Sequence, residues 1–144
     1  MSILNMKRVL VGVDDSTDAL LAFEYAIKRA IKDDLELVIV SILESDDLNV
    51  YQALNKDYVH GQYNDLEKHV LDYQEQARAE GVKKVRAVIA EGEPGEVIIK
   101  EVIPKVQPDL LIIGSKAKEG IAKYFGSQAA YMAKYAPVPV LVVR

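Results

Sequence analysis

Apolar runs of strand length alternate strictly with helical patterns along this chain. The apolar runs lie at residues 9–13, 35–43, 85–89, 110–113 and 138–143. Between them, apolar residues recur every three or four positions, at 19–31, 59–77, 93–106 and 128–136. Continuous apolar strands are typical of a sheet that is covered on both faces. The alternation therefore predicts an α/β fold, a single doubly wound five-stranded parallel sheet with helices on both faces and right-handed crossovers.

Glycine, proline and polar residues mark the ends of the predicted helices. Ser16 or Thr17 is suited to cap the first helix, because a hydroxyl oxygen accepts hydrogen bonds from first-turn amides. Gly81 is a natural end for the second helix, and Pro108 blocks continuation of the third. The third helix opens at Glu93-Pro94-Gly95-Glu96, where proline is tolerated and acids oppose the helix dipole. Its predicted core face consists of Val97, Ile98, Val102 and Val106.

The chain has 144 residues, 50% of them hydrophobic, and no cysteine. At this length one domain, spanning residues 1–144, is the default, and it buries enough surface to fold without cross-links. The absence of cysteine excludes a disulfide scaffold, a thiolate metal site and a cysteine nucleophile, and it suits a reducing compartment.

Charge and hydropathy narrow the expected partners and location. The chain carries 18 basic and 22 acidic residues, a net charge of −4. A mildly acidic domain repels nucleic-acid phosphates unless its cations cluster, so we expect no nucleic-acid partner. No stretch approaches the ~18–20 uncharged residues that cross a bilayer, and the charge order of residues 1–15 is unlike that of a signal peptide. We therefore expect a cytoplasmic protein with no membrane partner.

Two strand ends carry residues suited to a ligand. The first strand ends at Gly12-Val13-Asp14-Asp15-Ser16 and the fourth at Gly114-Ser115-Lys116-Ala117. Ligands of open α/β sheets bind outside the carboxyl ends of the strands, where neighbouring crossovers leave in opposite directions. With the strand order 3-2-1-4-5, which we expect here, these two ends are adjacent and share one crevice.

The chemistry of these ends favours a nucleotide. Glycine backbones allow close approach of an anion, Ser115 and Ser127 can donate hydrogen bonds to phosphate, and a helix amino terminus favours negative charge. Asp14 can accept hydrogen bonds from ribose hydroxyls, and Lys116 supplies positive charge. A purely structural interpretation stays open, because turn glycines, capping residues and solvated lysines occur in every such fold. The acidic segment 44–55 also has two interpretations, as a lid over the ligand site or as a solvated connection.

Several familiar catalytic patterns are missing. Neither G-x-G-x-x-G after the first strand nor G-x-x-x-x-G-K-[ST] occurs in the chain. No histidine lies near the serines, so a nucleophile and its base have no visible members. Asp14-Asp15 resembles the acidic metal pair of phospho-receiver domains, but the further aspartate that a receiver needs is replaced by Glu44 or Glu91. We expect no enzymatic turnover beyond slow, incidental hydrolysis of a bound nucleotide.

Three segments in order resemble the universal stress protein family. They are the opening residues 8–16 (RVLVGVDDS), residues 108–115 (PDLLIIGS) and the ending 136–143 (APVPVLVV). The resemblance implies a cytoplasmic stress-response protein with a Rossmann-like, adenine nucleotide alpha hydrolase-like fold. It also implies a homodimer formed through the last strand, and a family in which some members bind ATP and others do not.

The resemblance also assigns positions to a bound nucleotide. Adenine would lie near Gly12, Val13 and Ile42, and ribose near Asp14. The phosphates would lie near Gly114, Ser115, Gly126, Ser127 and Gln128, with Lys116 adding charge. ATP, or a related nucleotide such as AMP, is the expected ligand, with Mg²⁺ as its companion ion.

The phosphate loop departs from the family pattern in two ways. ATP-binding members carry G-x2-G-x9-G-[ST], and here Gly114 and Gly126-Ser127 match its ends. Ala117 replaces the second glycine, and only residues 118–125 separate it from Gly126, one residue fewer than the pattern. The sequence therefore leaves two functions open: a nucleotide-binding regulatory dimer, or a member of the same family that binds no nucleotide and acts through protein–protein interaction.

The last strand has the features of a sheet edge. Pro139 interrupts a β-branched run, and proline is tolerated at an edge because its missing N–H is not needed there. An exposed apolar edge is usually covered or paired. We therefore expect isologous pairing of residues 138–143 across a two-fold axis. The predicted interface consists of Val138, Val140, Leu141 and Val142.

Overall fold

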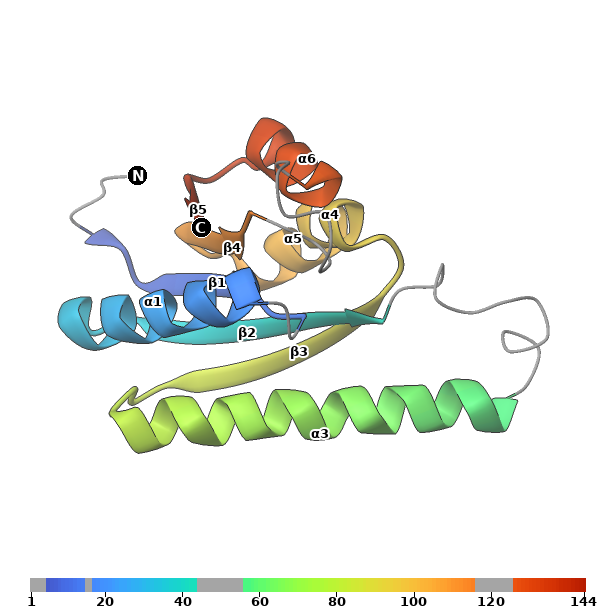
Figure 1. The fold of residues 1–144 in the computed structure, drawn as a ribbon. Helices are drawn as coiled ribbons and strands as arrows, with labels where there is room; N and C mark the ends of the chain where they lie inside the picture. The colour runs from blue at the N-terminus through green and yellow to red at the C-terminus, as the bar shows by residue number, and fades with distance from the viewer. Residues whose placement is uncertain (1–4, 15–16, 44–55, 116–125) are drawn as a thin grey trace.

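A computed structural model describes residues 5–14, 17–43, 56–115 and 126–144. Its core is a parallel sheet in the order β3-β2-β1-β4-β5 (Figure 1). The strands are β1 Arg8–Gly12, β2 Glu36–Leu43, β3 Val85–Glu91, β4 Leu110–Gly114 and β5 Val140–Val143. The predicted fold class and strand order are confirmed.

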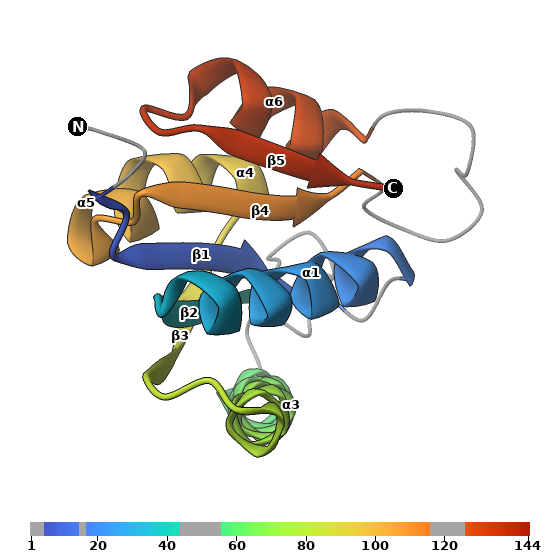
Figure 2. The ribbon, with the colours of Figure 1, turned by 90° about the vertical axis from the view of Figure 1, so that its left-hand side faces the viewer.

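Helices cover both faces of the sheet (Figure 2). They are α1 Thr17–Asp33, α3 Lys56–Glu80, α4 Pro94–Val97, α5 Ile103–Val106 and α6 Ser127–Tyr135, with the π-helical turn η3 Ile98–Val102 joining α4 to α5. Buried residues of α1 and α3 pack on one face, and those of α4, η3, α5 and α6 pack on the other. Crossovers therefore leave the sheet in both directions, as a doubly wound fold requires.

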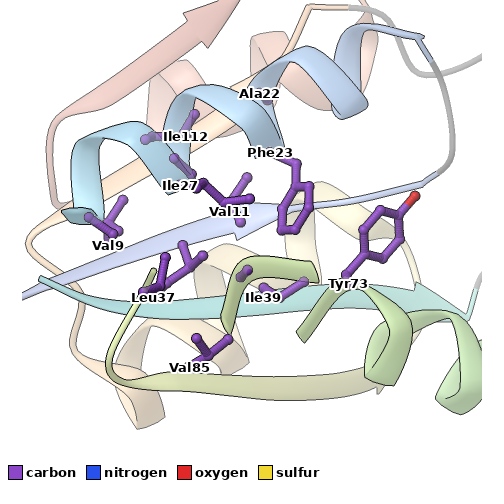
Figure 3. Packing of buried hydrophobic residues seen from close by; sticks show 14 of the residues in the cluster. Val9, Val11, Ala22, Phe23, Ile27, Leu37, Ile39, Tyr73, Val85 and Ile112 are labelled. Carbon is purple, nitrogen blue, oxygen red and sulfur yellow. The ribbon is translucent and has the colours of Figure 1, made fainter. Parts of the chain in front are cut away.

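Side chains of successive residues in the central strands point to opposite faces of the sheet. Val9 and Val11 belong to the cluster under α1 and α3, whereas Leu10 belongs to the cluster under α4 and α6. On the first face, Phe23 and Tyr73 meet edge to face, with ring centroids 4.9 Å apart (Figure 3). The uninterrupted apolar runs at β1 and β4 thus correspond to strands that are buried on both sides.

The helix predicted over residues 93–106 contains a π-helical turn that the periodicity did not indicate. Pro104 has no N–H, and its ring crowds the carbonyl group of residue 100 in a regular helix. The Ile103 N–H instead bonds to the carbonyl oxygen of Ile98, five residues earlier, which widens the helix at this point. The four predicted core-face residues are all buried, and Ile103 joins them.

The edge at which the strands begin is held by charged groups. Glu36 accepts hydrogen bonds from Arg8 and from Arg86, the latter at 3.2 Å. Burial raises the pKa of Glu36, but the hydrogen bond from Arg8 and the charges of both arginines outweigh it, so the pKa is lower than usual. The Asp109 carboxylate accepts from the N–H groups of Lys7 and Arg8 at 2.7 and 3.0 Å. These contacts tie the starts of β1, β2 and β4 together and leave the opposite edge for a ligand.

The last strand is shorter than predicted and lies at an edge of the sheet. β5 begins at Val140, and both Val138 and Pro139 precede it. The Pro139 carbonyl oxygen still accepts from the Leu111 N–H at 3.0 Å, so the chain reaches β4 before the strand is regular. All four residues of β5 are half-buried.

Candidate functional site

A cleft opens at the carboxyl ends of β1, β2 and β4, against the starts of α4 and α6. It has a cavity volume of about 90 Å³ and opens to solvent. The residues that line it are Gly12, Val13, Asp14, Ala19, Val40, Ile42, Pro94, Ile98, Ile113, Gly114, Gln128, Ala129 and Met132. Most of them are apolar, so the cleft is suited to a flat, weakly polar group rather than to a hydrated ion.

The strand order produces this cleft. β1 lies directly beside β4, with Val11 opposite Ile112 in the register. The chain leaves β1 toward α1 on one face and leaves β4 toward α6 on the other face. Neighbouring crossovers that diverge in this way leave space at the switch point. The adjacency on which the predicted site depended is therefore present.

The segment after β1 is held against the end of β2 by two hydrogen bonds. The Val13 N–H bonds to the Val40 carbonyl oxygen at 3.0 Å, and the Val13 carbonyl oxygen accepts from the Ser41 hydroxyl at 3.2 Å. Both contacts fix the backbone just before Asp14, whose side chain is exposed at the cleft. A carboxylate is thereby placed beside an apolar pocket.

The cleft brings together many of the residues that the sequence pointed to. Gly12, Val13, Asp14, Ile42, Gly114 and Gln128 all line it. Ser115, Gly126 and Ser127 do not line the cleft, although they lie at the end of β4 and the start of α6. Lys116 and Ala117 lie outside the described residues, so their predicted parts in a phosphate loop stay predictions.

Ser115 connects four segments around the site. Its hydroxyl donates to the Asp18 carboxylate at 2.5 Å, and both side chains are buried. Its N–H bonds to the Val143 carbonyl oxygen at 3.0 Å, and its own carbonyl oxygen accepts from the Gly126 N–H at 2.8 Å. In this arrangement the hydroxyl is bound to α1 and is not directed to a ligand.

Asp18 is a site-shaping residue that the sequence reasoning missed. It lies in the first turn of α1, and a signal was present because residues 18, 22, 26 and 30 follow one another at helical spacing. The backbone of Asp18 also explains why residue 114 is a glycine. A Cβ atom at Gly114 would lie 2.7 Å from the Asp18 carbonyl carbon and 2.8 Å from the Ala19 nitrogen. The glycine allows α1 to begin directly against the end of β4.

Gln128 also makes a contact that the sequence did not indicate. Its Oε1 atom accepts a hydrogen bond from the Gly95 N–H at 2.7 Å, which joins α6 to α4 across one wall of the cleft. A Cβ atom at Gly95 would lie only 2.8 Å from this oxygen. The glycine at residue 95 is therefore a consequence of close packing between the two helices.

The receiver-like alternative has little geometric support within the described chain. Glu91 ends β3, and β2 lies between β3 and β1, so Glu91 and Asp14 are not on neighbouring strands. Asp15, Glu44 and Lys116 lie outside the described residues. Over residues 5–14, 17–43, 56–115 and 126–144, no three His, Asp or Glu side chains form a group suited to a metal ion. In the same part of the chain, no helix has the length and apolar character needed to span a membrane.

Comparison with known proteins gives a consistent result. The family model described as the universal stress protein family matches residues 5–144. A Staphylococcus haemolyticus protein named as a universal stress protein is 30% identical over 142 residues, which cover 98% of this chain and 86% of that protein. The solved structure of UspA from Lactobacillus plantarum matches with a TM-score of 0.84 at 19% identity, over 96% of this chain and 98% of that chain.

A second solved structure is of a universal stress protein from Archaeoglobus fulgidus in complex with dAMP. It matches with a TM-score of 0.69 at 18% identity, over 99% of this chain and 100% of that chain. At these identities the two structures support the fold alone. The family match extends over nearly the whole chain, and we conclude that the chain belongs to the universal stress protein family.

Proposed function

We propose that this protein binds an adenine nucleotide, ATP or AMP, in the cleft at the ends of β1 and β4, as a regulatory ligand rather than as a substrate. The observation that carries the proposal is the combination of an apolar pocket with the Asp14 carboxylate at its side. An aromatic base requires apolar walls, and ribose hydroxyls require an acceptor. The related structure with dAMP supports this choice of ligand.

The surrounding backbone suits the rest of the nucleotide. The base would lie between Val13, Ile42 and Ile98, with the ribose at Asp14. The phosphates would then extend past Gly114 toward Gly126 and Ser127 at the start of α6, where the helix dipole favours anions. Mg²⁺ would accompany the phosphates of ATP.

A second function has one observation in its favour. Ala117 replaces the second glycine of the ATP-binding pattern, and the loop is one residue short. A shifted amide and a crowding methyl group each weaken phosphate binding, so the protein would then act through protein contacts alone.

Titration calorimetry with ATP and AMP, with and without Mg²⁺, separates the two functions. Saturable heat supports the first, and its absence under all four conditions supports the second.

Replacing Asp14 by alanine is expected to weaken ATP binding at least about tenfold, because a lost hydrogen bond to a charged group is worth roughly 1.5–3 kcal/mol. The change is measured by the same titration. Asp65→Ala, an exposed carboxylate on α3, removes the same charge away from the cleft and serves as the control. Equal affinities of the two variants would place the nucleotide elsewhere.

We further propose that β5 pairs with its copy in a homodimer. Pro139 and Val143 direct their carbonyl oxygens at β4, so Val140 and Val142, which alternate with them, direct theirs to the open edge. Sedimentation at micromolar concentration is expected to show a dimer. Val142→Pro removes an N–H that faces away from β4 and is expected to yield a folded monomer, whereas a wild-type monomer would contradict the pairing.

A further inference from the structure

Gln128 is the one uncharged polar side chain among the described residues that line the cleft. It lies in the first turn of α6, is half-buried, and contacts the first turn of α4 through Gly95. The helices α6 and α4 lie close together (Figure 1). Only Asp14 offers a second polar side chain there, and a carboxylate is an acceptor. Any hydrogen bond donated to a ligand by a described side chain of this cleft must therefore come from Gln128.

The contact with Gly95 decides which end of the Gln128 amide is available. Gly95 is in the first turn of α4, where an N–H has no partner within the helix. An N–H pairs only with an acceptor, so the oxygen of the Gln128 amide must face it, at 2.7 Å. The NH₂ group is then directed away from Gly95. This orientation follows from the chemistry of the donor.

The close packing around Gly95 makes this orientation difficult to change. A Cβ atom at Gly95 would lie 2.8 Å from the Gln128 Oε1 atom and 3.2 Å from the Gln128 carbonyl oxygen. The side chain and backbone of Gln128 thus both lie against Gly95. A donor held in one orientation recognises an acceptor selectively, because little conformational entropy is lost when it binds.

We propose that the NH₂ group of Gln128 donates a hydrogen bond to a ring nitrogen of the bound base, and that Gln128 is a specificity-determining residue of the cleft. This inference rests on the proposed function. The ring nitrogens of adenine that carry no hydrogen are acceptors at the edge of a flat, otherwise apolar ring. Such a ring suits the walls proposed for the base, Val13, Ile42 and Ile98, with Gln128 as the single donor. The family resemblance implies phosphates near Gln128, but the hydrogen bond to Gly95 shows that its side chain extends toward α4.

The test compares ATP with 1-deaza-, 3-deaza- and 7-deaza-ATP, each of which replaces one ring nitrogen by C–H. Wild-type protein is expected to bind one of these analogues about tenfold more weakly than ATP and the other two nearly as well. Gln128→Glu keeps an acceptor for the Gly95 N–H but has no donor at neutral pH. This variant is expected to bind ATP at least about tenfold more weakly and to lose the preference over the discriminating analogue.

The affinity ratio between ATP and an analogue removes the effect of the added charge, because all four nucleotides carry the same phosphates. Gln76→Glu, on the exposed surface of α3, adds an equal charge elsewhere and is expected to keep the wild-type ratios. Thermal unfolding of Gln128→Glu is expected to match that of wild type, since the contact with Gly95 is retained.

Three outcomes decide the inference. Loss of the preference in Gln128→Glu, with the preference kept in Gln76→Glu, supports it. ATP binding by wild type with equal affinity for all three analogues, or an unchanged preference in Gln128→Glu, overturns this inference and leaves the proposed function standing. Failure of wild type to bind ATP at all overturns the proposed function and this inference together.

Discussion

Gly114→Ala is expected to lower the free energy of unfolding by about 3 kcal/mol, at the upper end of the usual cost of overpacking a core. The added Cβ would lie 2.7 Å from the Asp18 carbonyl carbon and 2.8 Å from the Ala19 nitrogen. Both atoms are backbone at the start of α1, so no side chain can rotate to make room. The helix must move away from β4, and its buried face moves with it. Urea denaturation measures the loss, and thermal unfolding should shift by about 6–12 °C.

Gly12→Ala is the matched control for this prediction. Gly12 also lies at a strand end and lines the same cleft, but a Cβ there would have Ile98 Cδ1 at 3.8 Å as its nearest neighbour. That distance is an ordinary contact, so the expected change in stability is within about 0.5 kcal/mol. Equal losses in both variants would show that loss of glycine at a strand end, rather than close packing against α1, destabilises the protein.

The contrast between these glycines also bears on the interpretation of the site. From the sequence alone, Gly114 was expected to give a phosphate room to approach. The structure gives it a packing reason as well, since Asp18 and Ala19 already fill the space above it. Substitutions at Gly114 therefore change folding and ligand binding together. Asp14, whose side chain is exposed at the cleft, gives the cleaner test of a bound nucleotide.

The fold was predictable because its determinants are local in the sequence. Each strand contains a mainly apolar run, interrupted by a few residues such as Ser41 and Arg86. Each predicted helix has a single apolar face, and residues such as Gly81 and Pro108 mark where elements end. Gly81 indeed follows α3 with φ +116°, in the region that favours glycine. Strand order then brought the ends of β1 and β4 together, and with them Asp14 and Gly114.

The features that were not predictable depend on contacts between distant segments. The Gly95–Gln128 hydrogen bond joins residues 33 positions apart, and the Ser115–Asp18 bond joins residues 97 positions apart. Helical spacing places Asp18 on the buried face of α1, but no local pattern identifies Ser115 as its partner, or Gly95 as the partner of Gln128. The π-helical turn before Pro104 is a different case, because proline within a helix can also produce a kink, and the pattern of apolar residues was compatible with both.

Asp18→Ala is expected to lower the free energy of unfolding by about 2 kcal/mol, within the range for a hydrogen bond to a charged group. The carboxylate accepts from the Ser115 hydroxyl at 2.5 Å, and both residues are buried. Removing the carboxylate leaves the hydroxyl without this acceptor in a place that water does not reach freely. Most of the loss is thus the cost of an unsatisfied buried group rather than the strength of the bond itself.

The double variant separates the cost of the unsatisfied group from the strength of the bond. In Asp18→Ala/Ser115→Ala neither polar group remains, so its loss of stability should be smaller than the sum of the two single losses by about 1 kcal/mol or more. Asp18→Asn keeps an oxygen acceptor and should lose less than Asp18→Ala. Strictly additive losses in urea denaturation would mean that the two side chains act independently. The backbone bonds of Ser115 to Val143 and Gly126 would then be what holds the end of β4 in place.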